Sequence, residues 1–589
     1  TDYGNFSNDK YIGEGWYWRT MATSNFLDQI FNINSLPTTP QQCRLKVFAY
    51  PVNQSTTITN EHRLALRLNN TTQLDTMYRD NFNRFDTTVF FSSSFLVNGN
   101  NTMRFLSRPA TGFSGTINFD MFEISYPRQF VFDSNAIYFN SDISDSSSRI
   151  FKIKGFVSSN PLSIIDTKNN FRISNFSSSG DTLIFIGKGN GNYQIVNKSI
   201  TKKPFRIKQR QVPNLVTSST GADYLIVYNK LFETPAEQLK QYRNSHDGFR
   251  SVKAEIEDIY DIFNYGMEDP VAVRRFTKNI YETWQTPKVK YLCLFGRGSL
   301  DPKKNFSSSI YYKNLIPVYG NPITDGYFAN FNFGAFTFMH QISVGRLPAY
   351  TLQEAQDMVN KIINYEGQGL QQWPKTNLFI AGGENVSQQL QFAAQSDYFI
   401  NTYVTGPPSS LSPVRAYIND SLGLLNYNYS DSIKNTINRG ALCVNFIAHA
   451  GNGYWDFVYD DPAVLSNGNK LPLILSMTCF TGKMGDGSFR SYGEKYTIYQ
   501  NKGSLGFIGT SGWSFSGTGN TYNDYLLRGI NQDTLRRIGE IISYASRKLS
   551  PDSSSFAAKN TNNCYNLMGD PAAKLILPSF PEFEIKESD

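Results

Sequence analysis

Six short runs of almost uninterrupted apolar residues constrain the fold of this chain more than any other feature. They lie between residues 221 and 512, and each has the length of a strand, as in YLIVY, YLCLF and CVNFI. Segments with helical periodicity, such as 269–284 and 351–367, alternate with them. Apolar strands that alternate with helices are typical of a parallel sheet covered on both faces. We therefore predict an α/β parallel-sheet domain.

The rest of the chain has the pattern of all-β modules. Residues 1–127 contain short alternating, aromatic-rich runs between Asn, Gly and Pro clusters, which is typical of a β-sandwich, here jelly-roll-like. We expect this module to be incomplete at its N-terminus. Residues 128–218 are predicted to form a small second β module. The α/β region divides into a first subdomain, 219–375, and a catalytic subdomain, 376–577; residues 578–589 are predicted to be a linker or the start of a further β domain.

Composition excludes several classes of protein. Charged residues make up 18% of the 589 residues and aromatic residues 15%, which excludes a disordered chain. No apolar run approaches the roughly 18–20 residues of a membrane-spanning helix. The net charge of +7 is small for this length, and we expect it to be spread along the chain, so no nucleic-acid partner is predicted. The low share of charged residues and the many Asn, Ser, Thr and Tyr residues resemble the composition of an extracytoplasmic protein. We expect any signal peptide to have been removed from it.

Histidine and cysteine are scarce. The four histidines and five cysteines show no CxxC, HxxxH or CxxH spacing, so we predict no zinc site built from neighbouring ligands. Five is an odd number, so at least one thiol lacks an internal disulfide partner. We expect Cys293 and Cys443 to be buried small side chains, and we find no sequence partner for Cys43 or Cys564. The remaining histidines are expected to be structural or solvated, namely His62, His246 and His340.

His449 and Cys479 each follow an apolar strand directly. They are separated by thirty positions and one connection, so neighbouring strands would bring imidazole and thiol to the same edge of the sheet. Such a pair makes a cysteine nucleophile, because the imidazole takes the thiol proton. The backbone N–H groups of Ala450 and Cys479 are candidates for stabilising an oxyanion. A single histidine after a strand is more often structural, so spacing alone leaves both interpretations open.

Seven blocks in order resemble the gingipain family of cysteine peptidases, over roughly residues 220–577. They are IEDIYDIFNYGMEDPVAVRRFTKNIYETW, YLCLFGRGSLDPK, PITDGYFANF, ISVGRLPAYTLQEAQDMVNKIINYE, GALCVNFIAHAGNGYW, MTCFTG and NLMGDPAAKL. The resemblance implies a caspase-like fold, with His449 as general base and Cys479 as nucleophile. It implies no required cofactor; family members often bind calcium, but no ligand cluster is readable here.

Upstream segments add to this resemblance. NFDMFEISYPRQF, FKIKGF and KPFRIKQRQVPNLVTSSTGADYLIVYN are similar to the β modules before the peptidase domain in the family's type IX secretion sortase. This similarity implies an enzyme of the bacterial outer-membrane surface, working beside other secretion components. Its polypeptide substrates would be exported proteins, whose C-terminal sorting domains it removes. The new carboxyl terminus would pass through a thioester to an amine on anionic lipopolysaccharide.

Two other functions remain open at this point. One is a secreted gingipain-like endopeptidase, in which water resolves the thioester. The other is a non-enzymatic surface-binding protein that keeps a degenerate peptidase scaffold.

The chain departs from the family pattern at several positions. Ala448 and Ala450 stand where glycines usually flank the catalytic histidine, and Arg297 replaces a common acidic residue. Asp325 matches the specificity aspartate of arginine-specific members, which makes it a candidate for binding substrate. Asp301 is a weaker candidate for orienting the site, since a turn-capping role also fits it.

Overall fold

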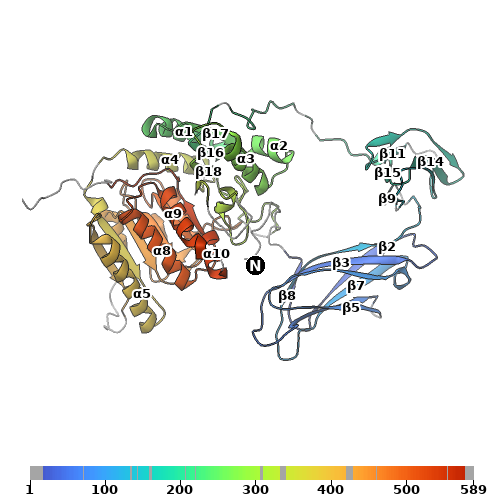
Figure 1. Ribbon diagram of the computed structural model, residues 1–589, viewed down its shortest axis with the longest axis horizontal. Helices are drawn as coiled ribbons and strands as arrows, with labels where there is room; N and C mark the ends of the chain where they lie inside the picture. The colour runs from blue at the N-terminus through green and yellow to red at the C-terminus, as the bar shows by residue number, and fades with distance from the viewer. Residues whose placement is uncertain are drawn as a thin grey trace, which may run out of the picture. The chain divides into compact units, whose positions relative to one another are not determined.

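The computed structural model describes residues 17–577 apart from gaps at 70–71, 133–134, 142, 158–161, 206, 208, 219, 306–309, 332–339, 370, 420–428, 459–460 and 553–554. The predicted linker at 578–589 and the first sixteen residues of the N-terminal module therefore lie outside the described residues. The described chain divides into two compact units, one ending at Arg210 and the other beginning at Gln211 (Figure 1). We describe each unit by itself.

The first unit begins with a β-sandwich. One antiparallel sheet has the order β1-β8-β3-β6, from Arg19–Met21, Ile117–Ser125, Gln42–Pro51 and Phe85–Ser92. The other has the order β2-β7-β4-β5, from Phe26–Ile33, Gly99–Ser107, His62–Leu68 and Thr72–Arg79. Alternate residues of these strands meet in one core, which includes Leu45, Val47, Leu66 and Phe105. This arrangement confirms the predicted sandwich.

A small β module completes the first unit. One sheet has the order β10-β14-β13, from Ser148–Ile153, Thr182–Lys188 and Phe176–Ser179. The other has the order β12-β11-β15-β9, from Phe171–Ile173, Leu162–Asp166, Asn192–Asn197 and Ala136–Asn140. Its core combines aliphatic side chains with packed aromatic rings: Phe151 and Phe185 stack with centroids 5.2 Å apart, and Tyr193 packs against both.

The second unit is built on a ten-stranded sheet of order β17-β16-β18-β19-β27-β26-β25-β22-β20-β21. The strands are Ser251–Glu255, Tyr224–Tyr228, Tyr291–Phe295, Ser343–Leu347, Tyr565–Met568, Gly506–Thr510, Leu473–Met477, Cys443–Ile447, Thr376–Ala381 and Ser412–Tyr417. All neighbours are parallel except β26 and β27, so the two halves of the sheet run in opposite directions. The connection from β26 to β27 contains three helices, α8 (Ser516–Asn531), α9 (Ile538–Leu549) and α10 (Phe556–Cys564), whereas parallel neighbouring strands are usually joined by a single crossover helix.

Helices cover both faces of this sheet, as the apolar strand pattern predicts (Figure 1). In the half that contains β20, β22, β25 and β26, one core joins the strands to α5 (Val386–Phe399), α8 (Ser516–Asn531) and α9 (Ile538–Leu549). The core on the other face includes α6 (Tyr429–Arg439) and α7 (Tyr492–Ile498). The remaining helices are α1 (Glu233–Asp247), α2 (Ile256–Asn264), α3 (Pro270–Thr283), α4 (Leu352–Glu366) and α10 (Phe556–Cys564).

Residues 249–266 also have helical periodicity in the sequence, but the helix begins later than this pattern predicts. Within 249–266, residues 251–255 pair with β16 as the edge strand β17, and the helix starts only at Ile256. Among the described residues, no helix is both long enough and apolar enough to cross a membrane.

Candidate active site

The site lies where parallel strands of one half of the sheet end. Strands β20, β22, β25 and β26 are consecutive neighbours, so their carboxyl ends share one edge. Ile447 of β22 pairs with Met477 of β25, and these are the last residues of the two strands. His449 and Cys479 each follow two positions later. The sheet therefore delivers the two predicted residues to the same edge and in the same register.

Cys479 differs from the other cysteines of the chain. All five are free thiols within the described residues, and Cys479 alone among them is partly exposed. The backbone N–H of Ser514, from the loop after β26, donates to its sulfur at 3.3 Å. Burial raises the pKa of the Cys479 thiol, and the Ser514 N–H opposes this rise because it stabilises the thiolate. The thiol is therefore accessible and depends on a base for ionisation.

His449 is held by the first turn of α5. Its Nε2 lies 3.1 Å from Oε1 of Gln388, and the backbone N–H of Glu384 donates to the same oxygen at 2.9 Å. The Glu384 donor fixes the orientation of the amide, because its partner has to be the oxygen. Nε2 of His449 must then carry a proton and donate it, which leaves Nδ1 of the neutral ring as the basic nitrogen.

No hydrogen bond joins His449 to Cys479 in the described structure. The imidazole pairs with Gln388 and the thiol with Ser514. The imidazole is 42% exposed, and its Nε2 also lies 4.0 Å from Oε1 of Glu384. Catalytic hydrogen bonds are often long in the absence of substrate, so the shared edge is the informative observation here.

The backbone beyond His449 forms a short hairpin with an available N–H. Strands β23 (Ala450–Gly451) and β24 (Tyr454–Trp455) pair, and Asp456 N donates to His449 O at 3.2 Å. Ala450 therefore occupies the non-hydrogen-bonded position opposite Trp455, and its N–H points away from the partner strand. Within the described structure, neither this N–H nor that of Cys479 donates to an acceptor. Both groups can face an oxyanion.

The alanine before the histidine has a packing partner. Ala448 is buried, and Gly382 at the end of β20 lies so close that a Cβ added there would be 2.9 Å from the Ala448 Cβ. The methyl group of Ala448 and the ring of Phe457 thus share the space that Gly382 leaves free beside β20.

Arg297 is neutralised in the interior. Its Nε donates to Glu494 Oε1 at 2.7 Å, and both side chains are fully buried. Its Nη2 donates to the carbonyl oxygens of Asp486 and Phe489, each at 2.7 Å. Because these two residues belong to the loop after Cys479, the arginine anchors the segment that carries the nucleophile.

The structure places Asp325 and Asp301 in structural surroundings. The Asp325 carboxylate is buried and bound by the Arg346 guanidinium through two contacts, at 2.7 and 2.8 Å. A substrate arginine would have to compete with this ion pair, so the geometry favours a structural role. Asp301 is also buried, and its Oδ1 accepts the N–H of Asn305 at 2.7 Å, which is a turn-capping contact.

The other histidines and cysteines lie elsewhere. His62 is buried, with Nε2 2.7 Å from Asn53 O, and burial lowers the pKa of His340 to about 4. These contacts agree with structural roles. The four remaining cysteines are buried, as expected for Cys293 and Cys443.

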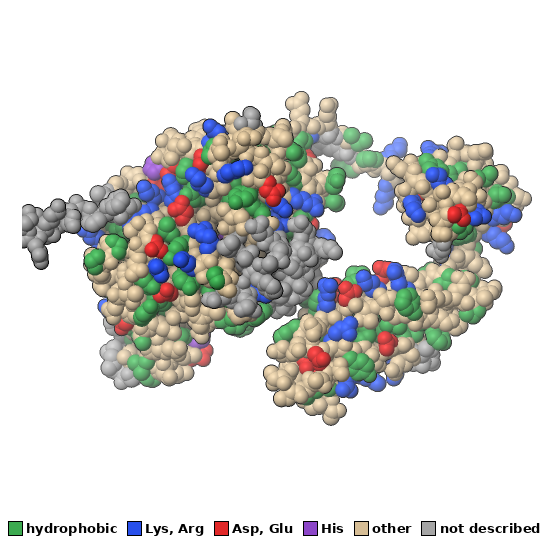
Figure 2. All heavy atoms as spheres, in the orientation of Figure 1, with side chains coloured by type: hydrophobic (Ala, Val, Ile, Leu, Met, Phe, Trp, Pro, Cys, Tyr) green, Lys and Arg blue, Asp and Glu red, His purple; other side chains and the backbone are tan. Residues whose placement is uncertain are grey.

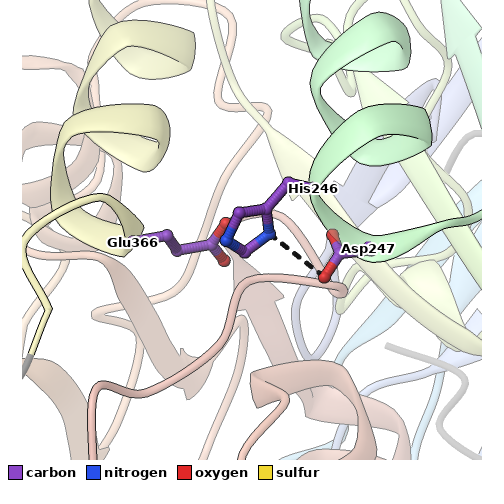
Figure 3. Close-up of side chains that lie close together, drawn as sticks. All are labelled: His246, Asp247 and Glu366. Carbon is purple, nitrogen blue, oxygen red and sulfur yellow. Dashed lines mark hydrogen bonds and ion pairs between the residues drawn. The ribbon is translucent and has the colours of Figure 1, made fainter.

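One side-chain cluster of the described residues has the spacing of a metal site. It consists of His246 and Asp247 at the end of α1 and Glu366 at the end of α4 (Figure 3). However, both carboxylates already bind Arg243, each at 2.8 Å, and Arg537 also binds Asp247 at 2.8 Å. The two carboxylates therefore belong to an ion-pair network between helices, and His246 lies at its exposed edge.

Sequence reasoning missed three residues of the site: Gln388, Glu384 and Ser514. Each follows the end of β20 or β26, the strands that flank the pair β22 and β25. Their contacts use an amide side chain or the backbone, and neither has a distinctive spacing in the sequence.

Comparison with known proteins agrees with this architecture. The sequence profile of peptidase family C25 matches residues 217–576. Gingipain R (RgpB), described as an Arg-specific cysteine proteinase, shares 17% identity over 62% of this chain and 80% of its own, with a TM-score of 0.49. PorU from Porphyromonas gingivalis shares 15% identity over 97% of this chain, with a TM-score of 0.53. No curated protein matches.

The fold and the family match together define an α/β cysteine peptidase preceded by β modules. The chain belongs to peptidase family C25, the gingipain family, which confirms the resemblance seen in its sequence. The likeness to PorU extends through the β modules and shows a shared fold. This chain spans 52% of the PorU chain.

Proposed function

We propose that His449 and Cys479 are the catalytic pair of this peptidase. The observation that carries the proposal is their equal register, two residues beyond the paired ends of β22 and β25. The exposed imidazole, the partly exposed thiol and the two available N–H groups support the same assignment. Substrate binding would bring Nδ1 within hydrogen-bonding distance of the sulfur.

The chemistry follows from these groups. Nδ1 of His449 takes the thiol proton, and the thiolate of Cys479 attacks the carbonyl carbon of the scissile peptide bond. The N–H groups of Ala450 and Cys479 stabilise the oxyanion of the tetrahedral intermediate. The C–N bond then breaks, the imidazolium protonates the leaving amine, and a thioester remains. Water releases a carboxylic acid from this thioester, whereas an amine releases a new amide.

We further propose that the enzyme is an extracytoplasmic sortase of the type IX secretion system. It would remove C-terminal sorting domains from exported proteins and transfer their new carboxyl termini to an amine, as on anionic lipopolysaccharide. The likeness to PorU along 97% of this chain, β modules included, supports this proposal. A secreted endopeptidase would use the same site and end with hydrolysis.

Two experiments test these proposals separately. A thiol-reactive peptide probe, followed by mass mapping, should label Cys479 in the wild-type protein and nothing in Cys479→Ala; equal labelling would remove the catalytic assignment. In the native host, Cys479→Ala should leave exported proteins with their C-terminal sorting domains attached. If that strain still removed the sorting domains while the wild-type protein was labelled at Cys479 in vitro, the enzyme would be a peptidase but not the sortase.

A further inference from the structure

The positive charge of the chain is concentrated in residues 129–210, which comprise the small β module and the segment that follows it. Residues 129–210 contain 12 Lys and Arg against 5 Asp and Glu, a net charge of +7. The whole chain contains 56 Lys and Arg against 49 Asp and Glu, which is also +7. The rest of the chain is therefore neutral, and the expectation that the charge is spread along the chain is wrong.

All seven Lys and Arg between residues 129 and 200 are exposed. Figure 2 shows more blue than red on the visible face of the part that Figure 1 labels β11, β14 and β15. Asp166 is buried, and its Oδ1 accepts the N–H groups of Lys168 and Asn169. Among the described residues of the module, the exposed acids are Asp145, which pairs with Arg149, and Asp181. Residues 129–200 contain 7 Lys and Arg against 5 Asp and Glu, so the placement of the cations on the folded module is more informative than its net charge.

One sheet of the module combines cations with exposed aliphatic side chains. In β10 and β14, Phe151 and Phe185 point into the core, so the residues beside them in sequence point outward. Ile150 pairs with Ile186 across the strands, and these side chains are 66% and 62% exposed. On the same outward side lie exposed lysines, and we call this set the lysine–isoleucine face: Ile150, Lys152, Lys154, Ile186 and Lys188.

The face has no charge compensation. Strands β10, β13 and β14 contain no acidic residue. Lys152 and Lys154 form no ion pair within the described structure, and Lys188 lies 5.8 Å from the Phe171 ring centroid. Ile150 and Ile186, each exposed by more than half, thus form a small apolar patch bordered by unpaired lysines.

We propose that the lysine–isoleucine face binds an anionic lipid surface. Lysines near such a surface are attracted to its headgroups, and aliphatic side chains gain free energy by entering the boundary with the acyl chains. Single-stranded nucleic acid instead favours aromatic rings for stacking, and the outward positions of these strands carry none. The following segment adds the exposed Lys202 and Lys203 and, unlike the face itself, an exposed aromatic ring, Phe205.

The test uses the full chain and sedimentation with vesicles. Wild-type protein should bind vesicles of phosphatidylcholine mixed with phosphatidylglycerol and not those of phosphatidylcholine alone, and added salt should weaken binding. The triple variant Lys152→Gln, Lys154→Gln, Lys188→Gln should bind at least about tenfold more weakly. Ile150→Ser with Ile186→Ser should weaken binding without changing its salt dependence. Probe labelling of Cys479 should be equal in all variants.

A matched control separates the face from net charge alone. Lys168→Gln, Arg172→Gln and Lys198→Gln remove the same charge from the surroundings of the other sheet, and this triple variant should bind within about twofold of wild type. Equal losses in both triple variants would overturn the assignment to this face. The proposal would also be overturned if the wild-type protein did not bind the anionic vesicles. It would likewise be overturned if a single-stranded oligonucleotide displaced the protein from these vesicles at a lower concentration than competing free vesicles do.

Discussion

Nε2 of His449 lies 3.1 Å from Oε1 of Gln388, and this contact selects the tautomer of the imidazole. The Glu384 N–H donates to the same oxygen and so prevents the amide from presenting its nitrogen to the ring. Gln388 is therefore a positioning residue, which acts on the reaction through His449 and prepares Nδ1 to receive the thiol proton.

Gln388→Ala should lower kcat and leave KM nearly unchanged, because the orientation of the base is lost while the substrate contacts remain. We expect a loss of about tenfold or more, below the roughly 10²–10⁴-fold contribution of the general base itself. Gln388→Glu keeps an acceptor for both donors and should retain more activity than Gln388→Ala. Gln391→Ala, an exposed change on the same helix, is the control; equal effects of the two alanine variants on kcat would contradict the positioning role.

Ala450→Pro removes the N–H that we assign to the oxyanion. Proline is tolerated at a strand position whose N–H lies outside the ladder, so the hairpin should still form. The expected loss in kcat is about 10²–10³-fold, as for removal of one oxyanion donor. Ala450→Gly keeps the donor and should remain within a few-fold of wild type. A folded Ala450→Pro variant with normal kcat would exclude this N–H from the mechanism.

Arg297→Ala should destabilise the peptidase unit by about 3–5 kcal/mol, because it leaves Glu494 buried and unpaired. Denaturant unfolding measures the change. Arg415→Ala breaks the exposed pair with Asp397 and should cost less than about 1 kcal/mol. Similar costs for the two variants would show that the interior pair does not anchor the loop after Cys479.

Stability should depend on pH through Lys361. Burial lowers the pKa of this lysine to about 7, and its Nζ donates to the carbonyl oxygens of Thr497 and Lys502. Between pH 7 and 9 the unfolded chain binds a proton at Lys361 that the folded chain lacks, so the free energy of unfolding rises with pH. Relative to Lys361→Met, the rise should approach about 1.4 kcal/mol per pH unit. Parallel stability profiles of the two proteins would contradict the lowered pKa.

The sequence alone is sufficient to predict the strands that carry the site. Apolar runs ending at Ile447 and Met477 predict adjacent buried strands, and the order of the chain places His449 and Cys479 beyond them. The contacts of Gln388 and Ser514 could not be predicted in this way, because they depend on how α5 and the loop after β26 pack. The antiparallel pairing of β27 with β26 could not be predicted either, because an apolar run indicates that a strand is buried and not in which direction it runs.

The rate of Cys479 alkylation as a function of pH tests the catalytic pair most directly. The other four cysteines are buried, and burial raises their pKa, so a small alkylating reagent reports on Cys479. We predict that the wild-type profile extends below the usual thiol pKa of about 8.5, and that His449→Ala moves it upward, because only burial and the Ser514 N–H then act on the thiol. Coincident profiles of wild type and His449→Ala would contradict the pairing.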